Sequence, residues 1–150
     1  MSADDTGIIE FRDKAVTHYE SQFQQWQAQN FGGDPNSPSA AWNADPDGDG
    51  IGNCCEYAFN LSPNDFSASP WTLDSTTVSS QKYLRLTIPK NPAATDITYE
   101  IQATGDLSTP ANWSSSGLII EEDTSTTLRV RDSVPMAPGP PRFMRVKIDR

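Results

Sequence analysis

The sequence predicts an α+β fold, in which an N-terminal helical hairpin packs on a small antiparallel β-sandwich of the fibronectin-III or immunoglobulin type. Between residues 8 and 60, apolar residues follow helical spacing on both sides of an acidic, glycine-rich loop. After residue 70, apolar residues recur at every second position among Thr and Ser, which is typical of half-buried strands. We therefore expect a helical segment at residues 1–66 and a β-sandwich segment at residues 67–150, joined in one compact unit.

The first predicted element is a single amphipathic helix over residues 8–31. Asp5 or Thr6 is expected to cap its start, and Gly32 with Gly33 to end it. One stripe of the helix is expected to face the core, because its members recur at steps of seven, three and four. The stripe consists of Ile9, Val16, Tyr19, Phe23, Trp26 and the polar Asn30.

A second, shorter helix is predicted from Asn53 to Asn60, after the acidic loop. Its apolar residues pair four positions apart, and a proline soon follows: Cys54, Cys55, Ala58, Phe59 and Pro63. The two adjacent cysteines are predicted to be small buried apolar side chains, because a disulfide between chain neighbours closes a strained ring. The sequence leaves open whether they are free thiols or such a vicinal disulfide.

Six short strands are predicted in the second half of the chain, separated by Pro, Gly and Ser. Two are weak and lie at residues 71–74 and 117–121. The four clear ones present alternate apolar residues to one face, namely Leu84, Leu86 and Ile88; Ile97, Tyr99, Ile101 and Ala103; Leu128 and Val130; and Met144, Val146 and Ile148. Turn-forming residues at this spacing between short strands favour an antiparallel sandwich.

The charge distribution excludes some classes of partner. The 150 residues hold 11 Lys and Arg against 20 Asp and Glu, a net charge of −9. Residues 1–75 contain two basic and 12 acidic residues, so carboxylates gather in the first half. A nucleic-acid partner is not expected, because phosphate contacts need clustered Lys and Arg. Membrane insertion is not expected either, because no apolar run reaches the roughly 18 residues that a membrane-spanning helix needs.

The strongest chemical signal is the loop from Asp45 to Glu56, which reads Asp-Pro-Asp-Gly-Asp-Gly-Ile-Gly-Asn-Cys-Cys-Glu. It fills the fixed positions of a twelve-residue calcium loop. Calcium binds six to eight oxygens, and alternate residues of a tightly coiled loop point inward to supply them. The predicted cofactor is therefore Ca²⁺, held by side chains of Asp45, Asp47, Asp49, Asn53 and Glu56 and by the backbone carbonyl of Ile51.

The loop departs from a regular EF-hand in two respects. Its eighth position is Gly52, where a regular EF-hand carries a hydrophobic residue, and the following helix is only about two turns long. The string Asp-Gly-Asp-Gly-Ile-Gly-Asn is more similar to the calcium loops of thrombospondin type 3 repeats and of dockerins. A single loop without a paired partner indicates a structural ion rather than a calmodulin-like opening switch.

The resemblance extends beyond the loop. An Asn-x-x-Glu-Tyr-Ala-Phe helix follows it, and the sequence then carries Tyr99, Ile101, Asp106-Leu107, Trp113 and Phe143-Met144-Arg145-Val146. Together with Trp26, Phe31, Trp42 and Pro63, this pattern resembles a C-terminal module of large secreted proteins of Verrucomicrobia and related bacteria. The resemblance implies a calcium-stabilised module that acts outside the cell or on its surface. The first five residues themselves show no signal-peptide pattern.

Enzymatic function is not expected. A Ser-His-Asp triad would depend on His18, the only histidine, and the run Glu121-Glu122-Asp123 is expected to be a solvated turn. We therefore expect a non-catalytic calcium-binding module that is monomeric. Two alternatives use calcium only as structural support: a carbohydrate-binding module with Trp42, Trp71 and Trp113 as a stacking platform, or an accessory domain that attaches to another protein.

Overall fold

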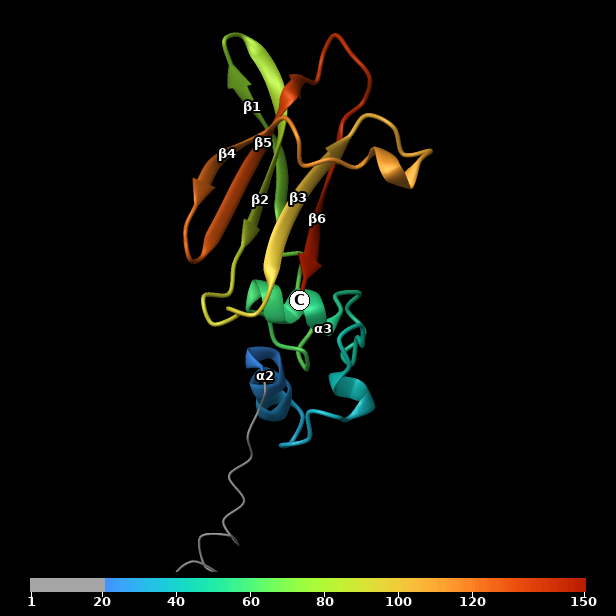
Figure 1. Cartoon of the computed structure of the whole chain (residues 1–150), viewed down its shortest axis with the longest axis vertical. Helices are drawn as coiled ribbons and strands as arrows, with labels where there is room; N and C mark the ends of the chain where they lie inside the picture. The colour runs from blue at the N-terminus through green and yellow to red at the C-terminus, as the bar shows by residue number, and fades with distance from the viewer. Residues whose placement is uncertain (1–20) are drawn as a thin grey trace, which may run out of the picture.

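The computed structural model describes residues 21–150 of the chain (Figure 1). Within this range, six strands form two antiparallel sheets, and two short α-helices precede them. In chain order the elements are α2 (Gln22–Asn30), η1 (Pro38–Ala40), α3 (Asn53–Phe59), β1 (Thr72–Val78), β2 (Gln81–Pro89), β3 (Thr98–Thr104), η2 (Pro110–Asn112), β4 (Leu118–Asp123), β5 (Thr127–Pro135) and β6 (Phe143–Asp149). The predicted α+β class with a sandwich-like β segment is confirmed.

The two sheets differ in size. The larger has the strand order β1-β2-β5-β4, and the smaller pairs β3 with β6. Every pairing is antiparallel, with Leu86 opposite Val130 in the larger sheet and Ile101 opposite Val146 in the smaller. Because side chains alternate across a strand, this register places the predicted apolar stripes on one face of each sheet.

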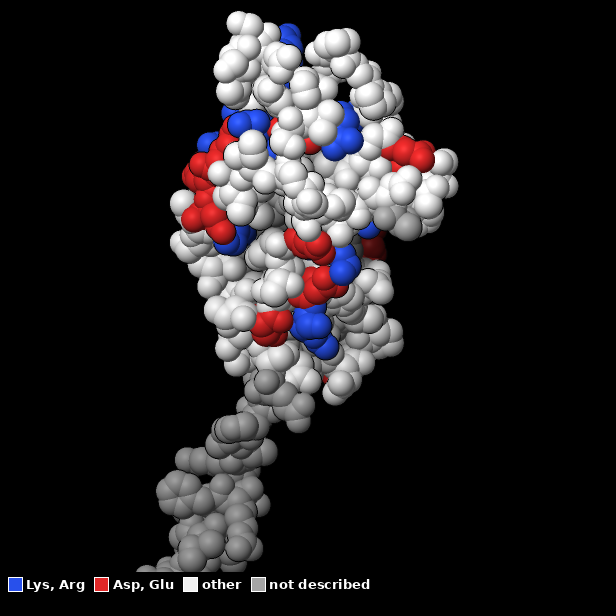
Figure 2. Space-filling view, turned by 45° about the horizontal axis from the view of Figure 1, so that its top comes forward, with Lys and Arg blue, Asp and Glu red and all other residues white. Residues whose placement is uncertain are grey.

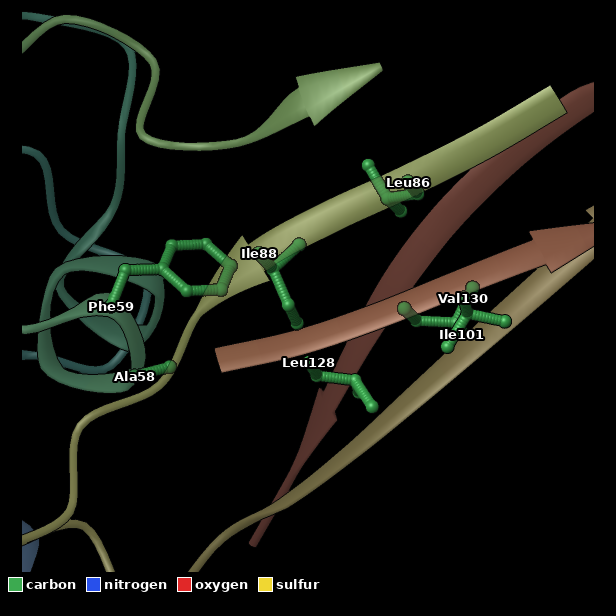
Figure 3. Packing of buried hydrophobic residues seen from close by; sticks show 7 residues of the cluster. All are labelled: Ala58, Phe59, Leu86, Ile88, Ile101, Leu128 and Val130. Atoms are coloured by element: carbon green, nitrogen blue, oxygen red, sulfur yellow. The ribbon is translucent and has the colours of Figure 1, made fainter. Parts of the chain in front are cut away.

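The main core lies between the two sheets and extends onto α3 (Figure 3). Leu86 and Ile88 of β2 meet Leu128 and Val130 of β5, and Ile101 of β3 approaches from the smaller sheet. Ala58 and Phe59 of α3 complete the same cluster. The four clear strand predictions are confirmed by strands that alternate more buried with less buried residues along most of their length.

Hydrogen bonds attach α3 to the sandwich. The carbonyl of Ala58 accepts from the Tyr99 hydroxyl at 2.5 Å and from the Asn91 backbone N–H at 2.9 Å. The Asn91 side-chain amide also donates to the carbonyl of Tyr57 at 2.8 Å. These bonds satisfy carbonyls near the end of a short helix that its own turns leave unpaired. The short helix is therefore held in place by the β segment.

A second, aromatic cluster joins α2 to α3. Phe23 of α2 lies 5.2 Å from Tyr57 and 4.7 Å from Trp42, measured between ring centroids. Asp96, just before β3, accepts a hydrogen bond from the Phe23 backbone N–H at 3.0 Å and from the Tyr57 hydroxyl at 2.5 Å. Both helices are thus anchored to the same loop of the β segment.

The prediction of one continuous helix over residues 8–31 is wrong at Ser21. This residue is extended (φ −140°, ψ 162°), and its hydroxyl accepts a hydrogen bond from the backbone N–H of Gln24. Ser21 therefore caps a helix that begins at Gln22, and Gly32 and Gly33 follow its end with positive φ angles of 66° and 86°. The predicted cap at Asp5 or Thr6, the stripe residues Ile9, Val16 and Tyr19, and His18 lie outside the described residues.

The two weak strand predictions are confirmed in type but are too short. β1 and β4 run longer than expected because both pair along their length with β2 and β5. The run Glu121-Glu122-Asp123 was predicted to be a solvated turn, but it belongs to β4, where all three acids form ion pairs with neighbouring basic residues. No helix between residues 21 and 150 is both long and apolar enough to cross a membrane.

Candidate metal centre

The acidic loop lies between η1 and the start of α3. Asp45, Asp47 and Asp49 each offer a carboxylate oxygen, and these oxygens all lie within 4.8 Å of one another. Asp45 is exposed, whereas Asp47 and Asp49 are half-buried. The spacing predicted from the sequence therefore brings the three aspartates together, and the triad could hold a metal ion.

Local hydrogen bonds coil the loop around its own carboxylates. Asp45 accepts from the backbone N–H groups of Gly48 and Gly50, both at 2.9 Å. Asp47 and Asp49 each accept from the residue two positions later, at 3.1 and 2.7 Å. Gly48 and Gly50 have φ angles of 77° and 87°, a conformation that side-chain-bearing residues rarely adopt. The alternation of Asp and Gly is thus what makes this coil possible.

Four oxygen atoms of the segment from Asp45 to Glu56, one of them in the triad, are buried without a hydrogen-bond partner among the described residues. They are Oδ2 of Asp47, Oδ1 of Asn53 and both carboxylate oxygens of Glu56. Asn53 and Glu56 are 0% exposed. Native proteins satisfy nearly all buried polar atoms, and an unpaired buried charge is costly. Four unsatisfied oxygens, one within the triad and three on Asn53 and Glu56, are an arrangement that a cation would complete.

The orientation of Asn53 is set by a segment that the loop motif does not include. Its Nδ2 group donates to the carbonyls of Ser39 and Ala41, each at 2.8 Å. Because both amide hydrogens are used in this way, Oδ1 is the atom left free. Sequence reasoning missed the carbonyls of Ser39 and Ala41, since backbone groups leave no residue-type signal in a motif.

Glu56 carries the electrostatic signature of the site. Burial raises its pKa to about 8, and repulsion from Asp47, Asp49 and Asp45 adds to the increase. The protein thus gathers four carboxylates where, among the described residues, no lysine or arginine forms an ion pair with any of them. A cation bound here would stabilise the ionised form of Glu56.

The sixth predicted ligand, the carbonyl of Ile51, stays a prediction. The Ile51 side chain is buried, at 6% exposure, and its N–H donates to Asp49. Gly52, at position eight of the loop, is the N-cap of α3, and its carbonyl accepts from Cys55 and Glu56 at 2.8 and 3.1 Å. The loop therefore passes directly into the helix that carries Glu56.

Cys54 and Cys55 are free thiols, and they are half-buried rather than buried as expected. Their sulfur atoms lie 3.8 Å apart. They fall between Asn53 and Glu56 on α3, but the potential metal ligands around the triad are all oxygens. Oxygen donors of this kind suit hard cations rather than zinc or copper.

The three tryptophans considered as a sugar platform do not share one exposed surface. The guanidinium of Arg145 covers the Trp113 ring at 4.4 Å, and Trp42 packs against Phe23 in the aromatic cluster. Trp71 is 39% exposed and contacts Phe59. Comparisons of the chain with protein-family models, with curated protein sequences and with solved structures find no match.

Proposed function

We propose that this chain is a non-catalytic calcium-binding module in which the ion is structural. The observation that carries the proposal is the set of buried, unpartnered oxygens of Asp47, Asn53 and Glu56 in the segment that holds the aspartate triad. Calcium suits this set because it binds six to eight oxygens in flexible geometry. Magnesium suits it less, because it prefers a smaller octahedral shell that keeps several waters.

The proposed ion would connect parts of the chain that otherwise repel one another. Asp45, Asp47 and Asp49 would bind from the loop, Glu56 from α3 with both oxygens, and Asn53 and the Ile51 carbonyl would complete the shell. Since α3 is bonded to the sandwich through Tyr99 and Asn91, the ion would stabilise the junction of the helical and β segments. In this sense the two helices and the loop act as an EF-hand-like unit.

We place this module outside the cell or on its surface, in keeping with its resemblance to the Verrucomicrobia-type secreted modules. Calcium is abundant there, and extracellular modules bind it with Kd values on the order of 10⁻⁴ to 10⁻³ M. We expect a monomer without a nucleic-acid partner or membrane insertion. On the face that Figure 2 shows, basic groups lie among acidic ones rather than in one large patch, which suits neither phosphate nor anionic lipid.

The test is calcium titration of the full chain by calorimetry. Binding by the wild type should be lost or weakened at least about 100-fold in Asp47→Ala and in Glu56→Gln, because each removes a charged ligand. Asp34→Asn is the matched control, because it removes an exposed carboxylate outside the loop. Wild-type affinity in both ligand variants, or no binding by the wild type, would refute the proposal.

Of the two alternatives, attachment to another protein has more support than carbohydrate binding. A cleft of about 350 Å³ opens between β1, β6 and α3, lined by Phe59, Trp71, Leu73 and Met144. Leu73 is 53% exposed although it lies opposite the buried Leu86. An apolar cleft with one partly exposed ring favours a protein surface over a stacked sugar. Titration with soluble oligosaccharides, followed by tryptophan fluorescence, should show no saturable change.

A further inference from the structure

The adjacent thiols on α3 occupy a position that the proposed calcium role does not use. Cys54 and Cys55 separate Asn53 from Glu56, and their sulfur atoms lie 3.8 Å apart. Both side chains are half-buried and so partly accessible to solvent. Cys55 also lines the apolar cleft of about 350 Å³ between β1 and β6. A small oxidant can therefore reach the pair.

A disulfide between these residues is incompatible with the helix that holds them. Neighbouring Cα atoms lie about 3.8 Å apart across a trans peptide, below the 4.4–6.8 Å that disulfides span. The sulfurs would also have to approach from 3.8 Å to a bond length of about 2.05 Å. Closing the ring must therefore change the backbone at residues 54 and 55.

That change would act directly on the metal centre. In the reduced protein, the N–H of Cys54 donates to the carbonyl of Trp42 at 2.9 Å, and the N–H of Cys55 to that of Gly52 at 2.8 Å. These bonds hold the first turn of α3. Within that turn Asn53 and Glu56, three positions apart in the sequence, lie on the same side of the helix. A ring at residues 54 and 55 would break this turn and separate the two oxygen donors.

We propose that Cys54 and Cys55 form an oxidation site whose disulfide releases the calcium, an inference that rests on the proposed function of the loop. With hydrogen peroxide, one sulfur attacks a peroxide oxygen. An S–O bond forms, the O–O bond breaks, and the products are a sulfenic acid and one water. The second thiol then attacks that sulfur, so that the S–S bond forms and a second water leaves. The sulfurs lose two electrons in total, and the peroxide gains them.

The coupling works in both directions. If the disulfide form binds calcium more weakly, bound calcium must disfavour the disulfide by the same factor, because coupling between two equilibria of one protein is reciprocal. Calcium-loaded protein should therefore resist oxidation, and calcium-free protein should be oxidised more readily. The site would respond to a loss of calcium and an oxidant together.

The experiment compares the full chain in its reduced and oxidised forms. Protein is treated with hydrogen peroxide or with diamide, an azo compound that takes two hydrogens from a pair of thiols, with and without saturating calcium. Intact mass should show a loss of about 2 Da that maps to the peptide containing residues 54 and 55. Calorimetry should then show calcium affinity at least about tenfold weaker in the oxidised form, with recovery after reduction.

The control is the double variant Cys54→Ser with Cys55→Ser, which keeps the loop and should bind calcium equally before and after oxidant. It also accounts for methionine oxidation, which peroxide causes in both proteins. A verified disulfide with unchanged affinity would overturn the inference, and so would the failure of a disulfide to form in calcium-free protein. If the reduced wild type binds no calcium, the proposed function itself fails, whatever the thiols do.

Discussion

Two buried carboxylates in this molecule show opposite solutions to the same electrostatic problem. Asp132 of β5 is 1% exposed, and its oxygens accept from Arg142 at 2.6 Å and from the Val134 N–H at 3.0 Å. Glu56 of α3 is 0% exposed, and neither of its oxygens has a partner among the described residues. The sandwich compensates its buried charge from within the chain, whereas the described residues offer Glu56 no such compensation.

The contrast extends to the acids around each site. In the β segment Asp74, Glu122 and Asp123 all pair with lysine or arginine, at 2.6 to 2.7 Å. Around Glu56 the neighbours are aspartates, which raise its pKa further. Paired carboxylates in a protein are therefore weak indicators of a ligand, and unpaired buried ones are strong indicators.

The largest expected effect tests the internally compensated site. Asp132→Asn should lower the free energy of unfolding by about 3 kcal/mol, because it leaves the guanidinium of Arg142 without its buried partner. The loss should be the same in calcium and in EGTA, since no metal takes part. Urea denaturation under both conditions measures it, and a loss confined to the calcium-loaded protein would contradict the comparison.

The next effect concerns the proposed calcium site. Calcium at 100 times its Kd should add about 2.7 kcal/mol to the unfolding free energy and raise Tm accordingly. Glu56→Gln should abolish this gain, yet at pH 8.5 in EGTA it should be no less stable than the wild type, because it removes an unpaired buried charge. Differential scanning fluorimetry of the wild type and of Glu56→Gln, each in EGTA and in calcium, measures both the loss of the calcium gain and the stability of the ion-free protein. A melting curve of the wild type that calcium leaves unchanged would exclude a structural ion.

An effect that is smaller per pH unit follows from the pKa of Glu56. Its pKa in the ion-free folded protein, about 8, lies above the ordinary value of 4.5, so folding favours the protonated form. Ion-free protein should consequently lose stability as pH rises from about 4.5 to 8. Calcium must displace that proton, so its affinity should fall by up to about tenfold per pH unit below 8. Calorimetry at pH 6.5, 7.5 and 8.5 measures the trend, and an affinity independent of pH would argue against Glu56 as a ligand.

The smallest effect is expected at a surface ion pair of the sandwich. Asp123 binds Lys90 at 2.7 Å but is 53% exposed. Solvent screens such a pair, so Asp123→Asn should change the free energy of unfolding by about 0.5 kcal/mol or less. Urea denaturation of Asp123→Asn and of Asp132→Asn compares the free energy lost at an exposed carboxylate with that lost at a buried one. Equal losses in the two variants would mean that burial is not what distinguishes them.

Local patterns in the sequence predicted what local interactions hold together. Alternation predicted the strands, because a half-buried sheet requires period two along each strand. The Asp-Gly spacing predicted the coiled loop, and the bonds that coil it join residues only two to five positions apart. The triad of Asp45, Asp47 and Asp49 follows from that spacing alone.

Distant contacts defeated the same reasoning elsewhere. Within the expected helix over residues 8–31, a helix begins only after Ser21. The Ser21 hydroxyl accepts from the Gln24 N–H, and Asp96, 73 residues along the chain from Phe23, accepts from the Phe23 N–H. The acidic run at residues 121–123 resembles a solvated turn by composition, but pairing with β5 draws it into a strand.

The sequence by itself determined the spacing of the oxygen donors and the alternation of the strands, because both depend on contacts between near neighbours in the chain. Only the tertiary structure decided which carboxylates are compensated. Folding brings Arg142 to Asp132, and it brings the carbonyls of Ser39 and Ala41 to Asn53, but among the described residues it brings no basic group to Glu56. Burial is a property of the whole packing, and burial turns an acidic loop into a candidate metal site.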